Sequence, residues 1–413
     1  MSNFGFRLIC CLYVFFNIIF FIYYAMGNPL AGDFKEKFGT VKLESLILGI
    51  TILLLSMLVL IYMCKYVAKL PLKRSMNIKA NFVIDSVFLL ITFFYFISVT
   101  VFSVGVSGVD AGNLKVNKVI LYGVALLQPS FLIMIYIFCF YHVKSFLYKI
   151  IFMLFIFTSL VSGRTGGLIF IFLLWASFSA YKIRIILMLI IGIALSPILR
   201  FIKYILLTYN RALGSGDAME LAEAIAVYKS EDTSMFEVYI YYVKAAFSRF
   251  EMISSNSFII ENHHALSYFA SSFGFLYPYD SYFISKFIGE GYFLQINKAQ
   301  HSLQSIFAYY LSGTTDWNAG IGLLGLAFID GLSSMPVYIM VIFLIFFTIT
   351  LSRVLKGNSA IKQLTFIYII IVLWHGWILA FMYYAQALLL FTMLILISAR
   401  FRPYRNRGLK TTS

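Results

Sequence analysis

The residues best suited to acid–base chemistry are concentrated in one long segment of the chain, residues 208–318. It holds eleven of the seventeen acidic residues and three of the five histidines, His263, His264 and His301. Because histidine titrates near neutral pH, it can take a proton from a hydroxyl group. We predict that His301, with Asp316 downstream, is the catalytic base or is oriented to be one, and that His263 and His264 compete for this role. The alternative is a solvated loop in which the histidines are structural hydrogen-bonding groups.

The sharpest local motif for binding an anion is Ser162-Gly163-Arg164-Thr165-Gly166-Gly167. Glycines let the backbone turn tightly and approach a ligand closely. The arginine offers a planar fork of donors that fits a phosphate or a pyrophosphate. We therefore predict that Arg164 binds pyrophosphate, with Gly163 beside the ligand. An interfacial arginine that snorkels to lipid headgroups is the alternative.

The order of these motifs over residues 150–335 resembles that of bacterial O-antigen polymerases and O-antigen ligases. Ser162–Leu168 is similar to the Ser-Arg-containing hairpin of these families, and a long loop with Arg and His follows a further span. The loop ends in a glycine-rich span opening, Asn318-Ala319-Gly320-Ile321-Gly322-Leu323-Leu324-Gly325. Some polymerases carry Arg or His followed at an eleven-residue offset by Gly, and His263 with Gly274 has this offset.

The resemblance implies a multi-span, lipid-using glycosyltransferase of GT-C-like architecture in the bacterial inner membrane, with its site facing the periplasm. Such an enzyme joins undecaprenyl-pyrophosphate-linked oligosaccharide repeat units into O-antigen polysaccharide. Lipid pyrophosphate is a good leaving group, so no cofactor and no metal are expected. The implied partners are the lipid-linked oligosaccharide, membrane lipids, a chain-length regulator protein and a flippase, and no nucleic acid. A ligase that transfers glycan to lipid A–core is the enzymatic alternative, and a flippase or other transporter is the alternative from a different class.

Further cations and aromatic residues fit this implied substrate. Arg249, in Ser248-Arg249-Phe250-Glu251, resembles the loop arginine of these enzymes; an Arg–Glu surface pair of little energetic consequence is the alternative. Arg200, Lys203 and Arg211 gather where a predicted span leaves the membrane, and they suit either the pyrophosphate or lipid headgroups. Aromatic surfaces for sugar rings are offered by residues 239–242 and 277–282. No Asp-x-Asp is present and the adjacent histidines diverge, so a metal site is not expected.

The elements that must position these residues are predicted to be membrane-spanning helices. The chain is 62% hydrophobic and 12% charged, and its mean hydropathy is +0.91, which is typical of an all-α polytopic membrane protein. Its net charge of +15 falls mainly in short loops and at the C-terminus, as the positive-inside rule predicts for cytoplasmic segments. The four cysteines show no pairing pattern, and we expect free thiols.

The apolar runs and the positive-inside rule predict about ten spans with both termini in the cytoplasm. The N-terminal membrane domain is predicted to have about seven spans and to cover residues 1–207. A large, mainly helical periplasmic loop that caps the membrane surface is predicted over residues 208–318. A C-terminal membrane domain of about three spans (319–399) and a basic cytoplasmic tail (400–413) are predicted to follow. In the C-terminal domain, Ala319–Ser352 is predicted as one broken span, interrupted at Asp330–Gly331 and Pro336. Leu364–Ala399 is predicted as a hairpin.

Overall fold

The computed structural model of the chain describes residues 4–31, 34, 39–72, 76–77, 81–106, 116–143, 145–163, 168, 170–172, 236, 239–240, 243, 247–280, 282, 301–313, 319–356 and 359–398. Within these residues the regular secondary structure is helical apart from one pair of two-residue strands and one isolated bridge. Six helical segments are long and apolar enough to cross a membrane. The prediction of an all-α membrane protein is therefore confirmed, whereas the count of ten spans includes residues that are not described.

The candidate spans and their neighbours follow the predicted apolar runs. They are α1 (Phe4–Ala25), α2 (Leu43–Lys69), α3 (Phe82–Thr100), α4 (Lys118–Leu127) with α5 (Pro129–Cys139), α6 (Phe146–Val161), α15 (Gly322–Asp330) with η5 (Gly331–Ser334) and α16 (Met335–Val354), α17 (Ser359–Tyr368) with the π-helical turn η6 (Ile369–Leu373), and α18 (Ile378–Ser398). Here α6 and α17–η6 are shorter than a full span. The apolar runs Gly166–Tyr181 and Ile185–Leu199 are predicted as the sixth and seventh spans, and most of this stretch lies outside the described residues. All four cysteines are free, as expected.

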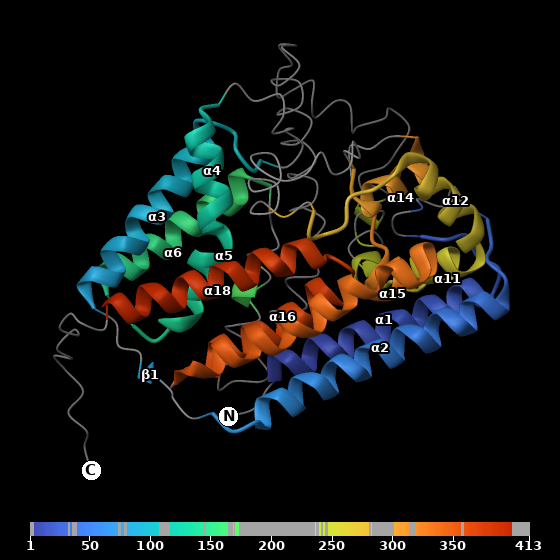
Figure 1. Ribbon diagram of the computed structural model, residues 1–413, viewed down its shortest axis with the longest axis horizontal. Helices are drawn as coiled ribbons and strands as arrows, with labels where there is room; N and C mark the ends of the chain where they lie inside the picture. Colours follow the sequence, from blue (N-terminus) through green and yellow to red (C-terminus); the bar gives the residue numbers. More distant parts are fainter. Residues whose placement is uncertain are drawn as a thin grey trace.

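One end of the helix bundle, called the basic end below, is tied together by backbone-directed hydrogen bonds. The Arg353 guanidinium donates to the carbonyl oxygens of Val67, at 2.8 Å, and Leu70 at the end of α2. The side-chain amide of Asn81 donates to the Ser398 carbonyl at 3.1 Å. Strand β1 (Met76–Asn77) pairs in parallel with β2 (Leu355–Lys356). The ends of α2, α16 and α18 and the start of α3 therefore lie together, as Figure 1 shows.

The opposite end of the bundle carries a helical cap, defined here as residues 247–280 and 301–313. Its elements are η3 (Ser248–Phe250), α11 (Ile253–Glu261), α12 (His263–Phe273) and α14 (Leu303–Ser312), which group together in Figure 1. The cap contains α11, which packs along α2 with Ser257 against Gly49, and its Glu261 carboxylate accepts a hydrogen bond from the Lys42 N–H at 2.8 Å. The cap therefore does not only lie on the surface, because α11 extends beside a candidate span.

The break predicted at Asp330–Gly331 is present, and the two pieces are not collinear. The Tyr338 hydroxyl, near the start of α16, donates to the Leu323 carbonyl at 2.9 Å and accepts from the Ala327 N–H at 3.1 Å. In a continuous helix Leu323 and Tyr338 would lie roughly 22 Å apart, at 1.5 Å per residue. The segment α15 therefore folds back beside the first turns of α16, and Gly322 begins a half-helix inside the bundle.

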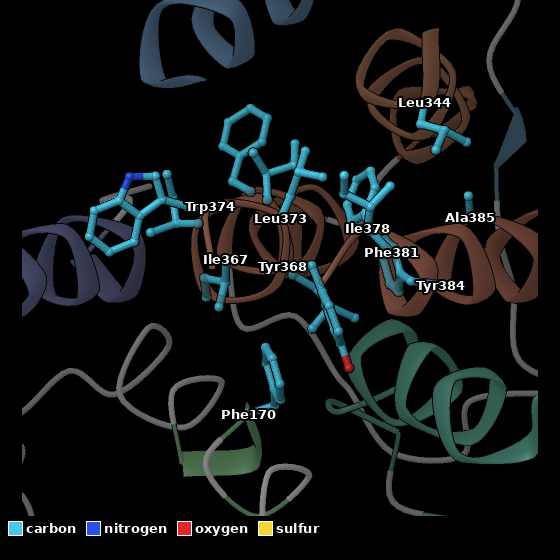
Figure 2. Packing of buried hydrophobic residues seen from close by; sticks show 14 of the residues in the cluster. Phe170, Leu344, Ile367, Tyr368, Leu373, Trp374, Ile378, Phe381, Tyr384 and Ala385 are labelled. Carbon is cyan, nitrogen blue, oxygen red and sulfur yellow. The ribbon is translucent and has the colours of Figure 1, made fainter. Parts of the chain in front are cut away.

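The predicted C-terminal hairpin is also present, with one short arm. Its arms, α17–η6 and α18, begin and end at the basic end, and they turn at Trp374–Trp377. Tyr368 on the first arm stacks on Tyr384 on the second, with ring centroids 4.3 Å apart, and on Phe170 at the same separation (Figure 2). Because the first arm is short, the turn lies beside the middle of other helices. It is called the hairpin tip below.

A second break divides the apolar run Val119–Tyr141, which is predicted as the fourth span. Gln128 has φ +46° and separates α4 from α5, which starts at Pro129. Proline lacks the N–H that would continue the helical ladder, and a left-handed residue before it ends α4. The side-chain amide of Gln386 on α18 donates to the carbonyl oxygen of Ala125, at 3.2 Å, and to that of Leu126. A side chain from the hairpin therefore compensates the carbonyl groups at this break.

Candidate functional site

A cavity of about 110 Å³ lies where the cap meets the start of α15 and the hairpin tip. Its walls come from four parts of the sequence: 275–278 and 302–304 of the cap, 321–323 with Leu326 at the start of α15, and 376–380 at the hairpin tip. The wall is therefore assembled from chain ends and turns rather than from helix faces. Ligand sites in transporters and other membrane proteins are often built from such interrupted helices.

Backbone hydrogen bonds hold these four segments together. The Leu276 N–H donates to the His301 carbonyl at 2.9 Å, which joins the two cap segments. The Gln304 side-chain amide donates to the Gly376 carbonyl at 2.9 Å and so joins the cap to the hairpin tip. The Leu323 N–H donates to the Trp374 carbonyl at 2.9 Å, which joins the half-helix to the same tip. These three bonds therefore link the four wall segments in series, from the cap through the hairpin tip to the half-helix.

Two glycines allow the half-helix and the hairpin tip to cross at backbone distance. Gly322 and Gly376 have φ of +68° and +83°, a region that favours glycine. A Cβ atom on Gly376 would lie 2.5 Å from the Gly322 carbonyl oxygen, and one on Gly322 would lie 2.5 Å from the Asn256 side-chain oxygen. A Cβ at Gly376 would therefore collide with backbone, whereas one at Gly322 would be strained by its φ and would displace the Asn256 side chain. This explains physically why glycines open the segment at 320–325.

The cavity wall is almost entirely apolar. Among the described lining residues, the polar groups are the side chains of Tyr277, Ser302 and Gln304 and the indole N–H of Trp377, and none of the lining residues carries a formal charge. The Gln304 amide is already used to hold Gly376. An apolar wall of this kind favours a hydrocarbon ligand and gives no compensation for a phosphate group.

The rim of the cavity differs from its wall because it offers aromatic rings and carboxylates. The Tyr277 hydroxyl donates to the Asp330 carboxylate at 2.7 Å, and the Tyr277 N–H donates to the Asp280 carboxylate at 3.2 Å. The rings of Tyr277 and Tyr279 stack with centroids 5.2 Å apart. Aromatic faces and hydrogen-bond acceptors together are suited to binding a sugar ring and its hydroxyl groups.

Partial burial sets the protonation of this rim. Desolvation raises the pKa of Tyr277, and the hydrogen bond to Asp330 and its charge raise it further. The phenol therefore remains a donor to Asp330 over the physiological range. Desolvation also raises the pKa of Asp280, and the hydrogen bond from the Tyr277 N–H opposes that shift.

Three of the predicted site residues, two of them in the cap, have described surroundings. His301 is exposed, and its carbonyl forms the bond to Leu276 next to the lining residue Ser302. His263 begins α12 with its Nδ1 2.9 Å from the Ile260 carbonyl oxygen, and its ring centroid is 3.9 Å from that of His264. Gly163 follows α6 with φ +67°. The structure thus brings the His301 segment to the cavity and leaves His263 at the junction of α11 and α12.

The predicted cations are described only in part. Arg249 lies in the 3₁₀ turn η3, whose backbone is described, beside α1. The alternative interpretation of this motif was an exposed pair of Arg249 and Glu251. Glu251 is instead buried, at 4% exposure. Arg164, Arg200, Arg211 and Asp316 lie outside the described residues, so their predicted roles stay predictions.

Two features of the site escaped sequence reasoning. Asn17, in the first span, bonds to the backbone on both sides of Glu251. The hairpin tip, Trp374–Trp377, lines the cavity, and its Gly376 was not singled out. A glycine between tryptophans in an apolar run was the available signal for the tip. A lone asparagine in an apolar helix was the signal for Asn17, since polar residues within spans are costly unless paired.

Among the residues that the structure describes, no group of three or more His, Cys, Asp or Glu side chains is arranged to hold a metal ion. Comparison with models of protein families, with curated proteins and with solved structures finds no match to this chain. Its function is therefore inferred from its own residues.

Proposed function

We propose that the protein is a glycosyltransferase that joins undecaprenyl-pyrophosphate-linked oligosaccharide repeat units into O-antigen polysaccharide at the periplasmic face of a bacterial inner membrane. The observation that carries this proposal is the cavity at the junction of bundle and cap, which is apolar in its wall and aromatic and acidic at its rim. A lipid-linked sugar has the same two-part chemistry. Its isoprenoid chain is apolar, and its glycan has hydroxyl groups and stackable ring faces.

The wall suits the part of the isoprenoid chain nearest the pyrophosphate. Burial of hydrocarbon contributes about 25 cal/mol per Å², and the wall offers Leu323, Leu326 and Ile378 for such contacts. The pyrophosphate then belongs outside the wall, where the cations predicted from the sequence act on it. These are Arg164, Arg249, Arg211 and Arg200.

The rim suits the sugar of the incoming unit, which acts as acceptor. Tyr277 and Tyr279 offer a stacked pair of rings, and Asp280 and Asp330 offer carboxylate acceptors for hydroxyl groups. The acceptor hydroxyl attacks the anomeric carbon of the growing glycan, and the bond from that carbon to the lipid pyrophosphate breaks. His301, or Asp316 instead, takes the proton, and the arginines stabilise the charge on the leaving pyrophosphate.

The direct test is polymerisation of purified lipid-linked repeat units by the purified protein, followed as a ladder of products on a gel. Loss of the true base lowers turnover by roughly two to four orders of magnitude while substrate still binds. The variants are His301→Ala, Asp316→Asn and His263→Ala, each with a separate binding measurement. Near-normal chain growth by His301→Ala removes His301 from the mechanism, and loss in Asp316→Asn alone assigns the role to the carboxylate.

Arg164 is tested in the same assay by Arg164→Lys. A lysine keeps the charge but cannot reproduce a bidentate contact with pyrophosphate, so we expect most polymer to be lost. Full-length polymer from this variant at normal expression would make Arg164 a lipid anchor rather than a ligand.

The alternatives give different outcomes in a deletion strain. A polymerase deletion leaves lipopolysaccharide with a single repeat unit on the core. A ligase deletion leaves no glycan on the core and accumulates lipid-linked polymer. A flippase deletion leaves the lipid-linked unit on the cytoplasmic side, and the purified protein would then show no chain growth.

The proposed orientation has its own test. A cysteine placed in the cap at Ser271, whose side chain is exposed, should react with a membrane-impermeant thiol reagent in intact spheroplasts. A cysteine at Lys69, at the basic end of α2, should react only after the membrane is opened. Reaction at Lys69 in intact spheroplasts would reverse the orientation.

A further inference from the structure

A buried asparagine in the first candidate span bonds to the cap segment that carries Arg249. Asn17 has no exposed surface. Its side-chain amide donates to the Phe250 carbonyl at 2.9 Å and to the Tyr13 carbonyl at 2.7 Å, and its side-chain oxygen accepts from the Met252 N–H at 2.8 Å. The N–H and the oxygen ends of the carboxamide thus both form hydrogen bonds with the backbone on either side of Glu251. We call this arrangement the Asn17 clamp.

Aromatic packing holds the same segment from the side. The Phe250 ring stacks on Phe16 with centroids 5.4 Å apart and packs against Tyr13 at 5.5 Å. Phe247 packs against Phe16 at 4.9 Å. Phe247 and Phe250, on the two sides of Arg249, therefore pack against one face of α1. A polar side chain inside an apolar helix is costly, and here it is compensated by bonds to a segment more than two hundred residues away.

A carboxylate anchors the segment on its other side. The Glu251 carboxylate accepts from the Ser254 N–H at 3.0 Å, from the Ser254 hydroxyl at 2.7 Å and from the Tyr24 hydroxyl at 3.3 Å. Tyr24 belongs to α1, so this contact repeats the tie between the first span and the cap. The backbone from Phe250 to Ser254 is consequently fixed at both ends.

The clamp lies beside the hairpin tip. Tyr13, which accepts from Asn17, packs edge-on against Trp374 and against His375, with centroids 5.1 Å apart in both cases. Asn256, which follows the clamped segment, contacts Gly322 where the half-helix begins. The turn that carries Arg249 is therefore linked through Tyr13 to the hairpin tip, and the segment that follows it reaches the start of α15, two of the parts that line the cavity.

We infer that Asn17 is a positioning residue for Arg249: the clamp fixes the turn η3 against α1, one aromatic side chain away from the hairpin tip, so that Arg249 meets the lipid pyrophosphate as it leaves. This inference rests on the proposed function, because it takes the pyrophosphate as the ligand of Arg249. Asn17 itself touches no substrate. Its effect passes through the backbone, as with other residues that orient a ligand-binding group.

The test is a double-mutant cycle in the polymerisation assay, with Asn17→Leu, Arg249→Lys and the double variant. Leucine keeps the size and the helix and removes all three hydrogen bonds. Misplacing a catalytic cation costs about 10- to 100-fold in rate, so we expect Asn17→Leu to lower kcat by about that factor with little change in KM. In the Arg249→Lys background the same change should add little, because the positioned group is already altered.

The matched control is Thr92→Val. Thr92 is also buried in a span and donates to the Phe88 carbonyl at 2.7 Å, within its own helix. We expect this variant to keep its kcat. A second measurement follows a cysteine at Ser248 in a background without the native cysteines, and Asn17→Leu should speed its reaction with a thiol reagent.

Three results overturn the inference. Asn17→Leu with the kcat of the wild type shows that the clamp is not needed. An equal loss in the wild-type and Arg249→Lys backgrounds shows a structural role that does not pass through Arg249. An unchanged reaction rate at the Ser248 cysteine shows that the clamp does not fix the turn. A wild-type protein that makes no polymer refutes the proposed function instead, which separates the two failures.

Discussion

The crossing of Gly322 and Gly376 gives the sharpest prediction for stability. In Gly376→Ala the new methyl group would lie 2.5 Å from the Gly322 carbonyl oxygen and 2.9 Å from its carbonyl carbon, and both atoms belong to backbone that cannot rotate away. The positive φ of +83° adds about 1–2 kcal/mol of strain for an L-residue. Overpacking of a buried contact adds about 1–3 kcal/mol. We therefore expect the free energy of unfolding to fall by about 2–5 kcal/mol.

The matched control is Gly27→Ala. Gly27 has φ +85°, and nothing lies within 4 Å of a Cβ built there, so this variant measures the strain alone. The measurement is the free energy of unfolding in detergent, from denaturation by SDS followed by circular dichroism. The difference between the two variants isolates the backbone contact and should be about 1–3 kcal/mol. Equal losses would show that the start of α15 and the hairpin tip do not meet at backbone distance, and the cavity as described would be wrong.

Three further predictions concern contacts that hold the cap and the basic end. Ser257→Ala should stabilise the protein by about 1 kcal/mol, because the buried Ser257 hydroxyl has no hydrogen-bond partner in the described part of the chain. The same substitution should also restore stability to a Gly49→Ala variant. A loss of stability in Ser257→Ala, measured in the same SDS titration, would show that the hydroxyl has a partner. Arg353→Gln should cost about 1–3 kcal/mol, since one neutral amide cannot replace both bonds to the end of α2; a loss no larger than that of Lys362→Gln would contradict this. Desolvation raises the pKa of Asp280 above its ordinary value of 3.8, so the folded state binds a proton at this carboxylate more tightly than the unfolded state does. Stability therefore falls as the pH rises from 3.8 through the pKa of the folded state. Asp280→Asn should therefore gain stability relative to wild type as pH rises from 3.8, and a constant difference across the titration would refute it.

The helices that cross the bundle were the part of the fold that sequence could predict. Apolar runs long enough to span a membrane determine α1, α2 and α3 within a few residues, because no other structure satisfies the backbone in hydrocarbon. The turn near Asp330 and the C-terminal hairpin followed from glycine, proline and the basic residues at both hairpin ends.

The paths of the interrupted helices could not be predicted in the same way. Hydropathy is high on both sides of Asp330, so it does not distinguish a bent span from a half-helix that folds back. The difference depends on the Tyr338 hydroxyl, which satisfies backbone groups of Leu323 and Ala327. Such a contact joins residues from two elements, and no local pattern reports it.

At the candidate site, the depth to which the cap enters the bundle could not be predicted from the sequence either. The start of α11, Ser254-Ser255-Asn256-Ser257, is polar and so predicts a surface helix, yet its three serines are buried. The burial is possible because glycines on neighbouring helices admit these side chains: Ser257 lies against Gly49, and Asn256 lies against Gly322. Small residues let membrane helices approach closely and let hydroxyl groups pack between them.

Neither half of that pattern is informative alone, since glycines in a span and serines in a loop are both common. Their pairing places α11 beside α2 and α15, and the bonds from Asn17 place the Arg249 turn beside α1. The position of the candidate site thus depends on matches between the loop and the spans. Those matches become visible only when both are seen in three dimensions.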